Sequence, residues 1–153
     1  MHQRLLALLF LLQLVSLRAQ TFSSTVNQLL PDDGSTVFFE IPVNGLPSVM
    51  DTMFGIEQVC LNINHPYVED MTVKLQSPNG QIIVLFAGVG GGGQNFANTC
   101  VAGEGLNFAL NSAPFSGLFQ CYGVLGNFNR GQDPNGTWKL VIHDTYPDAD
   151  QGF

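Results

Sequence analysis

Apolar and polar residues alternate in four short stretches of the chain, and this spacing is typical of strands that have one buried face. The stretches are residues 37–43, 56–64, 71–76 and 137–143. Pro42 lies in the first stretch, and because proline lacks a backbone N–H it predicts an edge strand there. The side chains expected to face inward are Val37, Phe39, Ile41, Val43, Val59, Leu61, Ile63, Met71, Val73, Leu75, Trp138, Leu140 and Ile142.

Turn sequences separate these stretches. Residues 77–80, Ser-Pro-Asn-Gly, lead directly into the apolar run Ile82–Phe86, which predicts a hairpin because proline fixes φ and Asn-Gly tolerates positive φ. A second turn, residues 133–136, precedes the last stretch, and Gly88–Gly93 is expected to be a flexible surface loop. Because no long segment after residue 19 carries a helical stripe, we expect an all-β fold, an antiparallel β-sandwich.

The first 19 residues have the order of a secretory signal peptide. Arg4 precedes a Leu-rich apolar run, residues 5–17, and Ala19 supplies a small residue at a cleavage point. An uncleaved membrane anchor is the alternative, but the run is too short to span a bilayer comfortably. We therefore predict a protein that is secreted or held at the cell surface. The predicted segments are a signal peptide (1–19), a polar lead-in (20–34) and one domain (35–153).

The charge of the chain is acidic, and removal of the signal peptide makes it more so. The 153 residues contain 5 Lys and Arg against 12 Asp and Glu, a formal charge of −7. Residues 1–19 hold two arginines and no acid, so the mature segment has a formal charge of −9. This balance argues against binding to nucleic acid or to anionic membranes, and it favours divalent cations.

Three cysteines, Cys60, Cys100 and Cys121, leave an odd number for pairing. Outside the cytosol two of them can form a disulfide. A Cys60–Cys100 bond would close a long loop and contribute roughly 4 kcal/mol. Cys121 would then be a buried thiol or an intermolecular partner.

Catalysis by this chain is not indicated by its motifs. His65 and Asp144 could serve a hydrolase, but no serine lies in a G-x-S-x-G sequence. We expect His65 to be a strand-end side chain hydrogen-bonded near Asp70, and His143 to face solvent.

Five stretches, taken in order, resemble the P domain (Homo B) that follows the catalytic domain of kexin- and furin-type proprotein convertases, in the version found in secreted bacterial proteins. The resemblance covers residues 35–153. The stretches are 59–65 (Val-Cys-Leu-Asn-Ile-Asn-His), 70–80, 95–100, 112–117 and 128–140, with Asp144 following.

The resemblance implies a jelly-roll-like β-sandwich without catalytic residues. In convertases this domain packs against a subtilisin-like serine endopeptidase and supports its folding, its stability and its response to calcium or pH. The family pattern continues into a further strand, so the resemblance implies that this sequence lacks the last strand. Cys121 and Tyr122 also stand where the family often has an aromatic residue and a proline.

Calcium is the expected cofactor, mainly because the resemblance implies it: P domains sometimes carry calcium, which prefers carboxylate, amide and carbonyl oxygens. The alternative interpretation is a solvated acidic loop with turn-forming Asp residues. The candidate ligands are Asp70, Asp144, Asp148 and Asp150.

Three classes of function follow from these observations. The leading hypothesis is a P-domain-like accessory module, whose partner is the catalytic domain or another domain of a larger secreted protein. The second is an adhesion or carbohydrate-binding sandwich, and the third, least favoured, is an enzyme. The second would use exposed aromatic residues, although a place in the sandwich core suits the candidates better. These candidates are Phe38, Phe86, Phe115, Phe119 and Tyr122.

Overall fold

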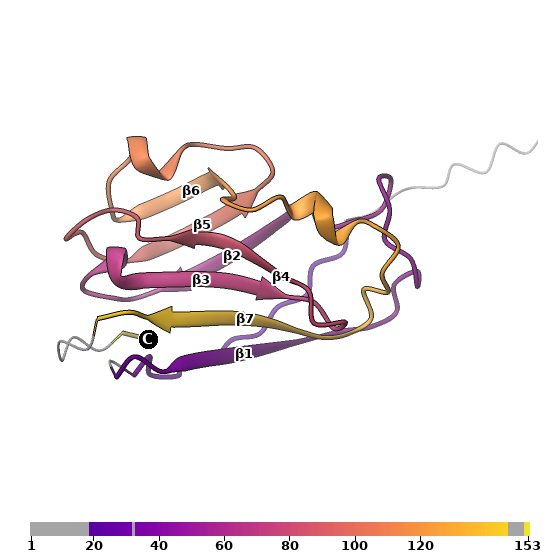
Figure 1. Ribbon diagram of the computed structural model, residues 1–153, viewed down its shortest axis with the longest axis horizontal. Helices are drawn as coiled ribbons and strands as arrows, with labels where there is room; N and C mark the ends of the chain where they lie inside the picture. Colours follow the sequence, from indigo (N-terminus) through magenta and orange to yellow (C-terminus); the bar gives the residue numbers. More distant parts are fainter. Residues whose placement is uncertain (1–18, 32, 147–151) are drawn as a thin grey trace, which may run out of the picture.

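The computed structural model describes residues 19–31, 33–146 and 152–153. This described part contains seven β-strands, three 3-10 helices of one turn and no α-helix (Figure 1). The all-β prediction is therefore confirmed. The strands are β1 (Thr36–Val43), β2 (Gln58–Ile63), β3 (Met71–Gln76), β4 (Ile82–Ala87), β5 (Phe96–Ala102), β6 (Phe115–Gln120) and β7 (Gly136–Asp144), and the 3-10 helices are η1 (Val68–Asp70), η2 (Phe108–Leu110) and η3 (Leu125–Phe128).

The strands form two sheets. The first has the order β1-β7-β3-β4 and is antiparallel throughout, whereas the second has the order β2-β5-β6. β1 is the outermost strand of the first sheet, as Pro42 predicts. The pairing of β5 with β6 is parallel and departs from the antiparallel expectation. Its physical cause is the long connection, residues 103–114, which lets the chain cross over before it re-enters the sheet in the same direction.

Five phenylalanine rings fill the space between the sheets. Phe86 comes from the first sheet, Phe96, Phe115 and Phe119 come from the second, and Phe108 comes from η2. Each ring is no more than 2% exposed, and neighbouring ring centroids lie 4.3–5.4 Å apart. This packing confirms the core interpretation for Phe86, Phe115 and Phe119.

The alternating stretches form strands with the expected faces. In β3 every second residue is buried, beginning with Met71, and in β2 Leu61 and Ile63 are buried while Cys60 and Asn62 are exposed. The hairpin between β3 and β4 closes through a hydrogen bond from Gly80 N to Ser77 O, 2.9 Å.

The sequence pattern missed β5 and β6. β5 pairs with β2 through a bulge, and Asn98 within it has a φ of +52°, so the inward positions change phase between Phe96 and Thr99. Strict period-two alternation is therefore absent from this strand. β6 buries only its residues Phe115 and Phe119, four positions apart.

The end of the lead-in and the last two residues meet just after β2. Leu30 forms an isolated antiparallel bridge with Gly152, and Phe153 exchanges backbone hydrogen bonds with Asn64. The signal-peptide prediction falls almost entirely outside the described residues. Among the residues that the structure describes, no helix has the length and hydrophobicity needed to cross a membrane.

Candidate functional site

A buried histidine and a carboxylate join the two sheets at one end of the sandwich. His65 follows β2 by two residues, and Asp144 ends β7. His65 Nε2 lies 2.9 Å from Asp144 Oδ2, and the two side chains are 1% and 4% exposed. The other ring nitrogen, Nδ1, lies 2.8 Å from the carbonyl oxygen of Tyr67. Both ring nitrogens are therefore engaged inside the protein. His65 is thus a hydrogen-bonded side chain just after a strand, and the carboxylate on its Nε2 is that of Asp144, which lies across the β3–β7 pairing from Met71, the neighbour of Asp70.

A hollow of about 500 Å³ lies at the same end and is lined by Tyr67, Glu69, Asp70, Gly88 and Tyr146. Asp70 is held there by Thr145, the residue after β7. Its carbonyl oxygen accepts hydrogen bonds from the backbone N–H of Thr145 (2.9 Å) and from its hydroxyl (2.6 Å). The fold thus gives this hollow two carboxyl groups and two phenol rings.

The predicted calcium ligands are only partly brought together. Asp70 lines the hollow, and Asp144 lies close by across the β3–β7 pairing, but the Asp144 carboxylate accepts from His65 and from the N–H of Tyr146 (3.3 Å). Asp148 and Asp150 lie outside the described residues. Within the described ranges, no group of three or more His, Cys, Asp or Glu side chains could hold a metal ion.

Asn95 connects the end of β2 to the start of β6. Its side-chain oxygen accepts from the His65 backbone N–H (2.9 Å), and its own N–H donates to the His65 carbonyl (3.1 Å). Its carbonyl accepts from the Phe115 N–H (3.1 Å). Asn95 has a φ of +68°, a conformation that asparagine adopts more readily than most residues.

Asn135, in the turn before β7, holds a distant loop. Its side-chain amide donates to the Leu46 carbonyl and accepts from the Leu46 N–H, both at 3.0 Å. The same amide group donates to Asp133 Oδ1 at 2.7 Å. Three residues later, Trp138 Nε1 donates to the Pro134 carbonyl at 2.8 Å. These side chains fix the backbone of the turn and of the loop at Leu46.

The stretches that resemble the P domain therefore form turns, contacts between strands and loops, and the buried His65–Asp144 pair. A comparison with known protein families matches residues 57–153 to the proprotein convertase P-domain. The chain belongs to this family. A comparison with curated proteins gives no match. In this P domain β1 precedes the matched region, yet it pairs along its whole length with β7 and so completes the first sheet.

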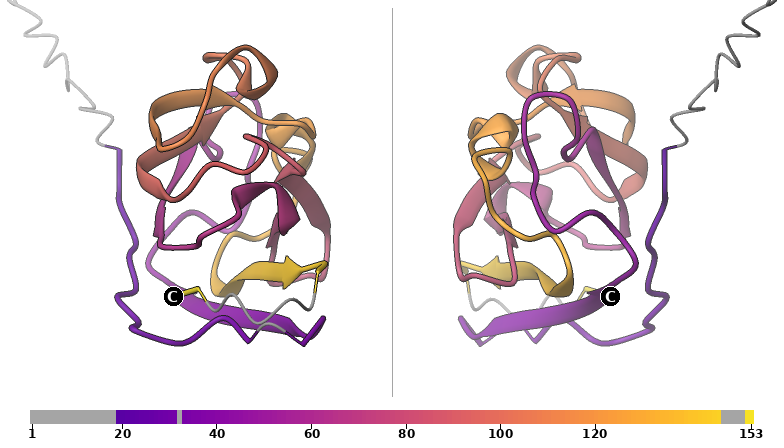
Figure 2. Two further views of the ribbon diagram at one scale, coloured as in Figure 1. Left: turned by 90° about the vertical axis from the view of Figure 1, so that its left-hand side faces the viewer. Right: turned by 90° about the vertical axis from the view of Figure 1, so that its right-hand side faces the viewer.

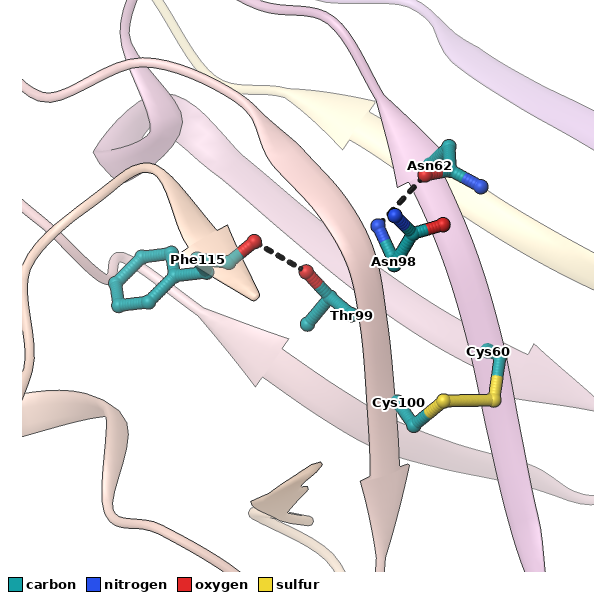
Figure 3. The surroundings of a disulfide bond; sticks show 6 residues. All are labelled: Cys60, Asn62, Asn98, Thr99, Cys100 and Phe115. Carbon is teal, nitrogen blue, oxygen red and sulfur yellow. Dashed lines mark hydrogen bonds between the residues drawn. A yellow bond between two sulfur atoms is a disulfide. The ribbon is translucent and has the colours of Figure 1, made fainter. Parts of the chain in front are cut away.

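The P domain contains one disulfide in its described part. Cys60 of β2 and Cys100 of β5 are paired residues of neighbouring strands, and their sulfur atoms are bonded at 2.08 Å. Figure 3 shows the bond spanning the two strands, with a hydrogen bond from Asn98 N to Asn62 Oδ1 further along them. The same figure shows Thr99 Oγ1 donating to the Phe115 carbonyl, 2.8 Å, which links β5 to β6. The disulfide therefore reinforces the sheet formed by β2, β5 and β6.

Cys121 is a buried free thiol. Its Sγ donates to the Val84 carbonyl at 3.3 Å, so the sulfur bridges β4 to the segment that follows β6. Burial raises the pKa of the Cys121 thiol, and a hydrogen bond from the Gly123 backbone opposes this in part. The neutral thiol is a weak nucleophile and a weak metal ligand.

Sequence reasoning missed three residues of the hollow, Tyr67, Glu69 and Tyr146. The available signal was proximity in the chain, since Tyr67 lies two residues after His65 and Tyr146 lies two after Asp144. His143 is half-buried, with Nδ1 3.3 Å from the Ser35 carbonyl.

Replacement of Asp144 should destabilise the P domain strongly. Asp144→Ala leaves the buried His65 without its carboxylate, and we expect the free energy of unfolding to fall by about 3 kcal/mol. Urea denaturation measures this loss, and Glu57→Ala, at an exposed carboxylate, should change stability by no more than about 0.5 kcal/mol. Equal effects of the two substitutions would contradict the structural role of the pair.

Removal of the disulfide should also lower stability. Cys60 and Cys100 are separated by 40 residues, and the double variant Cys60→Ala, Cys100→Ala should lose about 4 kcal/mol in the chain-entropy model. Cys121→Ala is the matched control, because it deletes a thiol without opening a cross-link and should cost about 1 kcal/mol. A double variant as stable as this control would show that the cross-link contributes nothing.

Cys121 should react slowly and only at high pH in the folded protein. Because burial raises its pKa, the thiolate forms at higher pH than in an exposed cysteine, whose pKa is about 8.5. The rate of modification by a disulfide reagent, measured from neutral to alkaline pH, should have its midpoint above that value. In the denatured protein with the disulfide intact, the midpoint should return to about 8.5. Identical profiles in both states would overturn this assignment.

Proposed function

We propose that this P domain is a non-catalytic module of a larger secreted protein, in which it packs against a subtilisin-like serine endopeptidase domain and supports its folding and stability. Membership of the P-domain family supports an accessory role. The acidic charge of the mature segment and its disulfide suit an extracellular protein.

The observation that carries the non-catalytic part of this proposal is the environment of His65. A hydrolytic triad needs one ring nitrogen on the carboxylate and the other on the nucleophile. In this P domain Nε2 faces Asp144, and Nδ1 faces the carbonyl of Tyr67. No ring nitrogen of His65 is left for a serine hydroxyl, so the pair serves to join the sheets.

Most of the aromatic side chains that could bind a carbohydrate are buried in the core. Phe86, Phe115 and Phe119 are at most 2% exposed. Phe38 and Tyr122 are each 51% exposed, but Phe38 lies on β1 at the edge of one sheet and Tyr122 follows β6 of the other. An aromatic platform for a sugar would need adjacent exposed rings, which this set does not provide.

The test of the proposed function is the thermal stability of the catalytic domain encoded with this P domain. At a P-domain concentration about 100 times the dissociation constant, the melting temperature of the catalytic domain should rise by about 5–10 °C. An unrelated acidic β-sandwich protein should leave it unchanged. An unchanged melting temperature with the P domain, or inhibitor-sensitive peptidase activity in the P domain alone, would contradict the proposal.

Calcium binding stays a prediction, and its support is the hollow that contains Asp70 and Glu69. We expect added calcium to raise the melting temperature of the P domain and excess EDTA to lower it, because a ligand that binds the folded state stabilises it. Asp70→Asn should abolish the calcium response, whereas Glu57→Gln should retain it. An identical melting temperature in calcium and in EDTA would contradict this prediction.

A further inference from the structure

Two turns of the P domain contain the sequence Pro-Asn-Gly, at residues 78–80 and 134–136. Figure 1 shows that β3 ends and β7 begins at the same end of the sandwich, and this end faces the viewer in the right-hand view of Figure 2. The turns lie against each other, because a Cβ atom on Gly136 would be only 2.8 Å from the Cβ of Pro78. One sequence therefore occurs twice in the same region, and its two copies can be compared directly.

An asparagine that precedes glycine can react with its own backbone. The glycine nitrogen gives its proton to water and attacks the side-chain carbonyl carbon of the asparagine, where a new C–N bond forms. The bond to the side-chain nitrogen breaks, and this nitrogen takes a proton from water and leaves as ammonia. A second water molecule opens the resulting succinimide to aspartate or isoaspartate. Glycine favours the attack because it has no Cβ atom to hinder its nitrogen.

The side-chain carbonyl of Asn79 is polarised for this attack. Its Oδ1 accepts from the Ser77 hydroxyl at 2.5 Å and from the Gln81 backbone N–H at 3.1 Å. The Gln81 N–H identifies this atom as the oxygen, since an amide nitrogen does not accept a hydrogen bond. Negative charge develops on the oxygen when its carbon is attacked, and two donors aimed at it stabilise that charge as an oxyanion hole does.

The leaving nitrogen of Asn79 is not held by the fold. Asn79 is exposed, and no residue in the part of the chain that the structure describes accepts a hydrogen bond from its Nδ2. The backbone N–H of Gly80 donates to the Ser77 carbonyl at 2.9 Å. Attack by the Gly80 nitrogen therefore requires one local hydrogen bond of the turn to open.

The side chain of Asn135 is held much more firmly. Its Nδ2 donates to the Leu46 carbonyl at 3.0 Å and to Asp133 Oδ1 at 2.7 Å, so the leaving nitrogen is bonded twice. Its Oδ1 accepts from the Leu46 N–H at 3.0 Å. Gly136 is the first residue of β7 and pairs with Val43. Movement of the Asn135 side chain toward the Gly136 nitrogen would break all three side-chain hydrogen bonds.

We propose that Asn79 is a site of spontaneous modification, which the folded P domain converts to aspartate and isoaspartate, and that its fold protects Asn135 from the same reaction. Each conversion adds a negative charge to the turn between β3 and β4. Isoaspartate also brings the side-chain carbon into the main chain and so lengthens this turn. The reaction needs water and no protease domain, so it is independent of the function proposed above.

Peptide mass spectrometry after incubation at neutral pH measures both sites in one sample, because tryptic cleavage at Arg130 separates them. We expect Asn79 to convert at least about tenfold faster than Asn135, which must break two more hydrogen bonds before attack. In urea the two rates should become similar, since both sites have the sequence Pro-Asn-Gly. Equal rates in the folded protein, or the same ratio of rates in folded and denatured protein, would overturn the proposal.

Two variants test the contacts that set these rates. Ser77→Ala removes the hydroxyl that bonds to Asn79 Oδ1 and should slow the conversion of Asn79 about fivefold, with Asn135 unchanged. Asp133→Ala removes an acceptor of Asn135 Nδ2 and should accelerate the conversion of Asn135 about fivefold, with Asn79 unchanged. Faster conversion of Asn79 in Ser77→Ala would contradict its activation by the fold. If Ser77→Ala does not fold, as judged by circular dichroism, the comparison of folded with denatured protein still decides the question.

Discussion

The contact between His65 and Asp144 is the constraint on which this end of the sandwich depends. It joins the segment after β2 to the last residue of β7, so it fixes one sheet relative to the other. An ionisable pair that is buried this completely is stable only when its remaining polar atoms are also bonded. Tyr67 and Tyr146 provide those bonds through their backbones, and Asn95 holds the His65 backbone. The position of the acidic hollow follows from the same contacts.

The residues that identify the family are structural in this chain. The side chains of Asn95 and Asn135 form hydrogen bonds with the backbones of His65 and Leu46. Trp138 donates a hydrogen bond to the turn before β7, and its ring packs against Phe128. Three features hold the small domain together. These are the loops anchored by side chains, the phenylalanine core and the disulfide across β2 and β5. Such a framework is consistent with the accessory role that membership of the P-domain family supports.

Much of the fold could be predicted from the sequence, because period-two spacing directly encodes β1, β2, β3 and β7, and the turn at residues 77–80 encodes the hairpin. β5 could not be predicted, since the positive φ of Asn98 breaks its alternation. The sequence around His65 also could not predict which carboxylate its ring contacts. Asp144 lies 79 residues away, and only the pairing of β3 with β7 brings it to the end of β2.

If the His65–Asp144 pair only joins the two sheets, the His65 ring should be inaccessible to a reagent in the folded protein. Treatment of the folded protein with diethyl pyrocarbonate, followed by peptide mass spectrometry, compares this ring with that of His143, which is half-buried near the surface. We expect His143 to be modified and His65 to be protected until the protein unfolds. Modification of His65 in the folded protein at a rate similar to that of His143 would show an available base and would contradict the structural role of the pair.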